Sequence, residues 1–164
     1  MLKLKTVFIA IGTNKGDREK NISIALKLLS DNKQIKLLKV SKMLKNPPQE
    51  GIKSGYFLNG TIKLLTSPSP SELKDFCKKI ERKLGRREKT EKKKKTSRTI
   101  DLDILFYEDE IINTEELTIP HSMLHKRYFV LIPLLEIGEN FVHPVFKKTI
   151  GELYSKLTNI KKYA

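Results

Sequence analysis

Hydrophobic and polar residues alternate along four separate stretches of the chain, each followed by residues typical of turns or loops. A period of two is the pattern of a strand with one buried face, so we expect β-strands at 4–11, 34–44, 56–65 and 98–107. The first is followed by Gly12-Thr13-Asn14, a turn signal whose polar side chains are candidates for the rim of a site.

Two stretches between these strands have the period of an amphipathic helix. Between Arg18 and Leu29 the apolar residues recur at i, i+3, i+4 and i+7, which predicts a helix that packs on something flat. The second helix begins with Ser69 and Glu72 as a capping box and Pro70 at its first position, and it stops at Gly85. Further helices are predicted at 128–137 and from Thr149 to Leu157.

The predicted order is strand, helix, strand, strand, helix, strand. This order is typical of a ferredoxin-like βαββαβ core, an α+β fold with an antiparallel sheet. The later helices would cover the second face of that sheet, giving three layers, α/β/α. The chain has no internal repeat or linker, so we expect one domain over 1–164.

The composition is that of a soluble globular domain, with 38% hydrophobic and 32% charged residues among 164. The single cysteine, Cys77, cannot form an internal disulfide, and the apolar run near the N-terminus stops at Gly12 without a cleavage pattern. We therefore expect a cytoplasmic protein, without a membrane partner and monomeric.

The net charge of +14 would attract nucleic acid, an anionic membrane or a phosphorylated small molecule, and charge alone does not choose among them. Most lysines are scattered and fit a solvated surface or the high-lysine composition of thermophiles. One local concentration is informative: residues 86–98 hold eight basic and two acidic residues.

Two carboxylates, Asp101 and Asp103, interrupt the apolar fourth strand. Strand alternation predicts one face with Ile100, Leu102, Ile104 and Phe106, and an opposite face with Thr99, Asp101, Asp103, Leu105 and Tyr107. Carboxylates at i and i+2 repel each other unless a cation lies between them, and oxygen ligands with open positions suit Mg²⁺. The alternative is a solvated or lysine-paired edge, and the spacing alone leaves both open.

The basic segment ends at Arg98, beside these aspartates, and the combination indicates a polyphosphate site. The segment has two interpretations, a loop that closes over a nucleotide or a solvated insert. A lone histidine is more often structural, but His121 with Arg127 could face the same phosphates. His125 and His143 do not make a zinc site, and no Walker A motif, kinase glycine-rich loop, nucleophile elbow or CxxC is present.

The segment "SRTIDLDILFYEDEIINTEELTIPH" resembles the 6-hydroxymethyl-7,8-dihydropterin pyrophosphokinases of folate biosynthesis. "IAIGTNKGD", "NPPQ", "FLNGTIKL" and "IERKLGR" are similar to further family motifs in the same order, so the resemblance covers nearly the whole chain. It implies an ATP-dependent transfer of diphosphate to the hydroxymethyl group of the dihydropterin, which releases AMP. It also implies two Mg²⁺ ions held by Asp101 and Asp103.

The resemblance also implies the ligand contacts, with Arg86, Arg98, Asp101 and Asp103 as the catalytic residues. On the nucleotide side it implies Arg86, Arg98, Ile104, Thr118, His121 and Arg127. On the pterin side it implies Asn46, Pro47, Phe57, Asn59 and Phe129. A flat heteroaromatic ring is suited by an aromatic sandwich and an amide at its edge, although the phenylalanines by themselves are equally typical of a core.

The basic segment departs from the family pattern. Lys94-Lys95-Thr96-Ser97 stands where the family usually has Arg-Trp-Gly-Pro, and Glu88 replaces a usual arginine. Phe57 replaces a tyrosine and Asn46 a threonine. Lysines 92 to 95 would supply charge without the forked geometry of arginine.

Two other functions fit the residues less well. A metal-dependent nuclease or phosphohydrolase would need further carboxylates for a two-metal site. An RNA-binding domain would expose sheet aromatics, and the acidic face of the fourth strand would repel a phosphate backbone. We expect small-molecule partners, ATP and the dihydropterin, and no nucleic acid.

Overall fold

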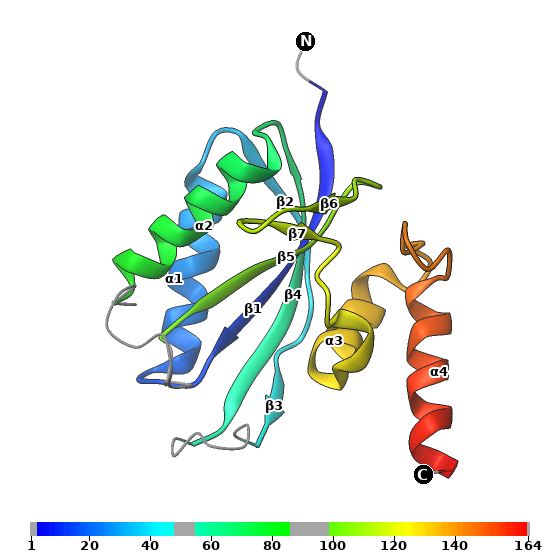
Figure 1. The fold of residues 1–164 in the computed structure, drawn as a ribbon. Helices are drawn as coiled ribbons and strands as arrows, with labels where there is room; N and C mark the ends of the chain where they lie inside the picture. The colour runs from blue at the N-terminus through cyan, green and yellow to red at the C-terminus, as the bar shows by residue number, and fades with distance from the viewer. Residues whose placement is uncertain (1–2, 48–54, 86–98, 164) are drawn as a thin grey trace.

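The computed structural model describes residues 3–47, 55–85 and 99–163 of the chain (Figure 1). Within these ranges, no helix combines the length and the apolar character needed to cross a bilayer. The strands are β1 (Lys5–Thr13), β2 (Ile35–Val40), β3 (Leu44–Asn46), β4 (Phe57–Thr66), β5 (Asp101–Tyr107), β6 (Ile112–Asn113) and β7 (Thr118–Ile119). The helices are α1 (Arg18–Asp31), α2 (Pro70–Lys83), η1 (Leu124–Lys126), α3 (Tyr128–Gly138) and α4 (Ile150–Tyr163).

The main sheet is antiparallel throughout, in the order β2-β4-β1-β5. The short strand β3 pairs with the start of β4, and β6 and β7 form a separate two-stranded sheet. Within the described ranges β5 therefore lies at an edge of the main sheet, with β1 as its one paired strand. The predicted α+β class with an antiparallel sheet is confirmed.

Helices lie on both faces of this sheet (Figure 1). On one face, β1 contributes Val7, Ile9 and Ile11 to a first apolar cluster that α1 and α2 cover with Ile22, Ala25, Leu29, Leu73, Cys77 and Ile80. On the other face, the sheet meets α3 and α4 in a second apolar cluster: Phe8, Leu105, Phe106, Leu124, Val130, Leu131, Leu134, Ile137, Ile150 and Leu153. This is the arrangement of layers that the sequence predicts.

The capping signals of the second predicted helix are confirmed. The Ser69 hydroxyl accepts a hydrogen bond from the Glu72 N–H at 3.2 Å, and Pro70 begins α2. Gly85 follows the helix with a φ of 101°, a left-handed conformation that glycine adopts without steric cost. In α1 the N-cap is Asp17, whose side chain accepts from the Lys20 N–H.

The strand limits differ from the predicted ones at two places. The predicted strand 34–44 ends at Val40, and Leu44 begins β3, which pairs separately with β4. Gly12 and Thr13, predicted as a turn, continue β1 because they pair with Asn59 and Leu58 of β4. Sequence period cannot see either event, since both depend on a partner strand that lies far along the chain.

The predicted facing of β5 holds up to Leu105 and is wrong for Phe106 and Tyr107. The register with β1 shifts there, since Ile9 pairs with Ile104 while Phe8 pairs with Phe106. Leu105 is the extra residue of this β-bulge, so Leu105 and Phe106 both enter the second apolar cluster and Tyr107 enters the first. Before the bulge the prediction holds: Leu102 and Ile104 lie in the first cluster.

A buried histidine sits beside the second apolar cluster. His143 is 3% exposed, its Nδ1 accepts hydrogen bonds from the N–H groups of Val145 and Phe146 at 3.1 Å, and its ring stacks on Phe146 at 4.2 Å between centroids. Burial, and next the neighbouring His125, lower the pKa of His143 to about 4. The native imidazole is therefore neutral at neutral pH.

We expect the free energy of unfolding to fall as the pH drops from 6.5 toward 4. The unfolded chain takes up a proton at His143 near pH 6.5, whereas the folded chain resists it until about pH 4, so the loss should reach about 3 kcal/mol. Urea unfolding between pH 7 and 4 measures it. His143→Asn keeps an acceptor and removes the titration, so its curve should be flatter; equal slopes would contradict the role of His143.

Candidate functional site

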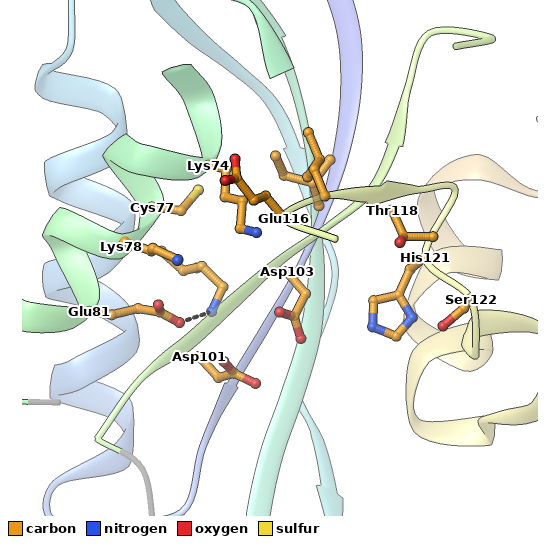
Figure 2. A pocket seen from close by; sticks show the side chains of 13 residues that line it. Lys74, Cys77, Lys78, Glu81, Asp101, Asp103, Glu116, Thr118, His121 and Ser122 are labelled. Carbon is orange, nitrogen blue, oxygen red and sulfur yellow. Dashed lines mark hydrogen bonds between the residues drawn. The ribbon is translucent and has the colours of Figure 1, made fainter. Parts of the chain in front are cut away.

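A cleft of about 300 Å³ opens at the free edge of β5 (Figure 2). It lies between α2 and the segment from β7 to His121, and residues 101–104 of β5 form its floor. It is lined by Lys74, Cys77, Lys78, Glu81, Asp101, Leu102, Asp103, Ile104, Glu116, Leu117, Thr118, His121 and Ser122. Five residues predicted on the nucleotide and metal side meet here: Asp101, Asp103, Ile104, Thr118 and His121.

Asp101 and Asp103 point to the same side of β5, with the His121 imidazole facing them across the cleft (Figure 2). Their strand neighbours in β1 are Gly12 and Ala10. Both aspartates are partly exposed, while Leu102 and Ile104 between and after them are buried. Alternation thus holds the strand in the core through one face and leaves two carboxylates, with Cα atoms about 6.6 Å apart, at the cleft.

Glu81 holds the free edge of β5. Its Oε2 accepts a hydrogen bond from the Leu102 N–H at 3.0 Å, and the side chain is only 6% exposed (Figure 2). Sequence reasoning missed this residue, although a signal was present. Glu81 follows Cys77 by four residues and Ile80 by one, so a charge stands inside the apolar stripe of α2.

Removal of this acceptor should make residues 101–104 of β5 less stable. We expect Glu81→Ala to lower the free energy of unfolding by about 1–3 kcal/mol, because the buried Leu102 N–H loses its partner. Amide hydrogen exchange by NMR should show faster exchange at Leu102. Glu81→Gln is the matched control, since its amide oxygen still accepts; equal protection of Leu102 in all three proteins would refute the edge role.

His121 is a neutral hydrogen-bond donor toward the cleft. Burial, and next the positive charge of Arg127, lower its pKa from the ordinary value, against a smaller opposite effect of Asp101. Its Nδ1 accepts from the Met123 N–H at 3.2 Å, so the proton of the neutral ring is on Nε2. The preceding Ile119–Pro120 peptide bond is cis. A neutral Nε2–H can donate to an anionic oxygen without adding a titrating charge.

The thiol of Cys77 faces the same cleft and is unreactive. Burial first, then the carboxylates of Glu81 and Asp103, raise its pKa to about 12. Thiolate is the nucleophilic form of cysteine, so at neutral pH this side chain acts as a small apolar wall. The effect of Asp103 on this pKa shows that α2 lies close to Asp103.

Two lysines of α2, Lys74 and Lys78, line the cleft opposite His121 (Figure 2). Neither ammonium group forms a hydrogen bond or ion pair with another residue in the described part of the chain. They were not predicted, because lysines are scattered along most of this sequence. Helix period alone assigns them to a side of α2 and does not say that β5 runs beside it.

The predicted pterin-side residues of β3 and β4 lie on the same sheet face as the aspartates. Asn46 pairs with Phe57, and Asn59 pairs with Gly12 of β1, which in turn pairs with Asp101. Cross-strand neighbours share a face, so Asn59, Gly12 and Asp101 form one row across three strands. The Nδ2 group of Asn46 is buried and has no hydrogen-bond partner among the residues that the structure describes, an arrangement that a polar ligand would satisfy.

Other predicted residues are less closely placed. Pro47 is exposed just after β3, and Phe129, in the first turn of α3, is partly buried against the second apolar cluster. Arg127 precedes α3 with its guanidinium 5.6 Å from the Phe129 ring, and it does not line the cleft, although its charge acts on His121. Arg86, Arg98 and lysines 92 to 95 lie outside the described residues.

The donor atoms at the cleft suit a hard cation. Two same-face carboxylates provide oxygen ligands and leave the remaining positions to water and phosphate, which is how Mg²⁺ usually binds. Over 3–47, 55–85 and 99–163, no three histidine, cysteine, aspartate or glutamate side chains converge to hold a metal without such help. The residues present fit a metal that arrives with a phosphorylated substrate.

Comparison with known proteins identifies the family. Residues 8–139 match the family model of 7,8-dihydro-6-hydroxymethylpterin-pyrophosphokinase. The 2-amino-4-hydroxy-6-hydroxymethyldihydropteridine pyrophosphokinase of Aquifex aeolicus is 39% identical over 91% of this chain and 90% of its own length. The folic acid synthesis protein fol1 of Schizosaccharomyces pombe is 38% identical over 94% of this chain, which spans only 21% of that longer protein.

Solved structures agree in fold. A Plasmodium falciparum HPPK-DHPS structure has a TM-score of 0.74 at 18% identity, and the matched region covers 94% of this chain and 42% of the Plasmodium chain. The sequence matches define a pyrophosphokinase, a transferase of folate biosynthesis. The chain belongs to the 7,8-dihydro-6-hydroxymethylpterin-pyrophosphokinase family. Neither a nuclease nor an RNA-binding domain finds support among the matches.

Proposed function

We propose that this chain transfers the diphosphoryl group of ATP to 6-hydroxymethyl-7,8-dihydropterin. The hydroxymethyl oxygen attacks the β-phosphorus, the bond from that phosphorus to the oxygen bridging to the α-phosphate breaks, AMP leaves, and the hydroxyl proton passes to solvent. The observation that carries this proposal is a shared sheet face. Asn46 pairs with Phe57, and Asn59, two residues further along β4, pairs with Gly12. Gly12 in turn pairs with Asp101, so the pterin-side residues and the aspartates follow one another across the sheet.

Asp101 and Asp103 are the residues that would hold magnesium, and we propose two ions, as the family resemblance implies. When bound, Mg²⁺ offsets the negative charge of the triphosphate and of the developing transition state. The side-by-side carboxylates support this role, because buried neighbours and the hydrogen bond from Leu102 to Glu81 anchor the strand that carries them.

We assign the nucleotide to the cleft at the edge of β5. His121 would donate from Nε2 to a phosphate oxygen, and Ile104 and Thr118 would lie on the adenine side. Arg127 would approach from the start of α3, where its charge already acts on His121. Arg86 and Arg98 complete the proposed set as catalytic phosphate contacts, on the resemblance alone.

We assign the pterin to the face formed by β3 and the start of β4. Asn46 and Asn59 would read the edge of the ring, and the unpartnered Nδ2 of Asn46 supports a polar ligand there. Phe57 and Phe129 would enclose its two faces; among the described residues no ring contact joins these two phenylalanines, as a slot for a third ring requires. Pro47 would border the ring.

The architecture proposed for this activity is a ferredoxin-like core. The strand order β2-β4-β1-β5, with α1 and α2 on one face, supports it. We also propose one domain over 1–164, since both apolar clusters share the same sheet. The monomeric state and the cytoplasmic location stay predictions.

The function is tested by incubation of the protein with ATP, Mg²⁺ and the dihydropterin, with nucleotide products separated by ion-exchange chromatography. We expect AMP and the pterin diphosphate in equal amounts, and no AMP when the pterin is omitted. Formation of ADP, or of AMP at the same rate without pterin, would overturn the proposal.

The two aspartates should be needed for turnover and not for folding. We expect Asp101→Asn and Asp103→Asn each to lower kcat by about 100-fold or more and to raise the Mg²⁺ concentration for half-maximal rate, with thermal unfolding little changed. Asp109→Asn, an exposed aspartate beyond the far end of β5, is the matched control and should keep wild-type kinetics. Full activity in either site variant would exclude a metal role.

A further inference from the structure

Gly12 stands at the centre of the row that joins the two proposed substrate regions. Its Cα partners are Asn59 in β4 and Asp101 in β5. Neighbouring strands lie about 4.8 Å apart, so the backbones of Asn59 and Asp101 are separated by roughly 10 Å with only a glycine between them. A side chain at this position would stand on the same face as the carboxylate and the amide.

The space above Gly12 is taken by the amide of Asn59. A Cβ atom built on Gly12 would lie 3.0 Å from Oδ1 of Asn59 and 3.7 Å from the Leu58 carbonyl oxygen. The first contact is too close, so any larger residue would push the amide away by a few tenths of an ångström. The Asn59 side chain therefore leans over β1, toward Asp101, in a seat that only glycine provides.

The Asn59 amide is positioned by packing and not by hydrogen bonds within the described residues. No hydrogen bond to another residue of the described ranges engages the Asn59 side chain, whereas other polar groups near the site, such as Glu81 and His121, are held by backbone N–H groups. The close approach to Gly12 is therefore a contact that limits where the Asn59 amide can lie. A group that reads a ligand edge must be positioned to within a fraction of an ångström.

We propose that Gly12 is a positioning residue for the acceptor: it seats the Asn59 amide so that the bound heterocycle places its hydroxymethyl oxygen in line with the phosphate held at Asp101. This inference rests on the proposed function, because it needs the pterin beside Asn59. It assigns to Gly12 a role in orienting one substrate only. The nucleotide, which we assign to the cleft beyond Asp101, does not depend on the position of the Asn59 amide.

Gly12→Ala should therefore affect the two substrates unequally. We expect kcat/KM for the dihydropterin to fall about tenfold or more, through both a higher KM and a lower kcat, while the Kd of a nonhydrolysable ATP analogue with Mg²⁺, measured by calorimetry, stays within about twofold. Gly138→Ala is the control for a steric squeeze away from the site, since its Cβ would meet the Phe8 ring at 2.9 Å. It should lower the unfolding temperature and leave the KM for pterin unchanged.

A double-mutant cycle with Asn59→Ala isolates the contact between position 12 and the Asn59 amide. Asn59→Ala removes the atom that the new methyl group meets, so adding Gly12→Ala to it should cost less than about twofold in kcat/KM. This comparison also decides the question if Gly12→Ala alone fails to fold. A further tenfold loss in the double variant, or an equal loss of affinity for the ATP analogue, would overturn the proposal. A wild-type protein that makes no AMP would overturn the proposed function instead.

Discussion

The pairing of β5 with β1 is the interaction on which the site depends. Among the described strands β5 pairs only with β1, and the register places Asp101 beside Gly12 and Asp103 beside Ala10, the two smallest residues of β1 on that face. Large residues in β1 at these positions would fill the region in front of the carboxylates. The opposite face of β5 is buried: Leu102 and Ile104 anchor the strand in the first apolar cluster and offset the cost of its charged face.

An edge strand with an unpaired ladder is a weak support for a site, and α2 compensates for this. Glu81 accepts a hydrogen bond from the Leu102 N–H, so β5 is held from both sides although none of the described strands pairs with its outer edge. The same carboxylate contributes to the raised pKa of Cys77, and the positive charge of Arg127 contributes to the lowered pKa of His121. The cleft thus contains two side chains that stay uncharged at neutral pH next to the two carboxylates that we propose as metal ligands.

The sequence predicted the parts of this molecule that depend on local chemistry. The cap at Ser69 and Pro70, the stop at Gly85, the period of α1 and the carboxylates of β5 were all visible in short windows. What stayed hidden depends on register between distant segments. The bond from Leu102 to Glu81 joins residues 21 positions apart, the seat of Asn59 depends on its pairing with Gly12, and the separate β3 follows from its pairing with β4. Alternation fixes which face a residue prefers, and only the partner strand decides what lies opposite.

The bulge at Leu105 has a consequence for how the length of this strand can vary. In a regular strand, gain or loss of one residue between Asp103 and Phe106 would turn either the carboxylates or the phenylalanine to the opposite face. Here Asp103 and Phe106 face the same side, and Leu105 is the extra residue between them. Deletion of Leu105 would therefore restore regular pairing with β1, with Asp103 and Phe106 still on the same face. The junction between the polar and the apolar half of β5 can therefore differ by one residue among relatives, with the strand's bend as the main change.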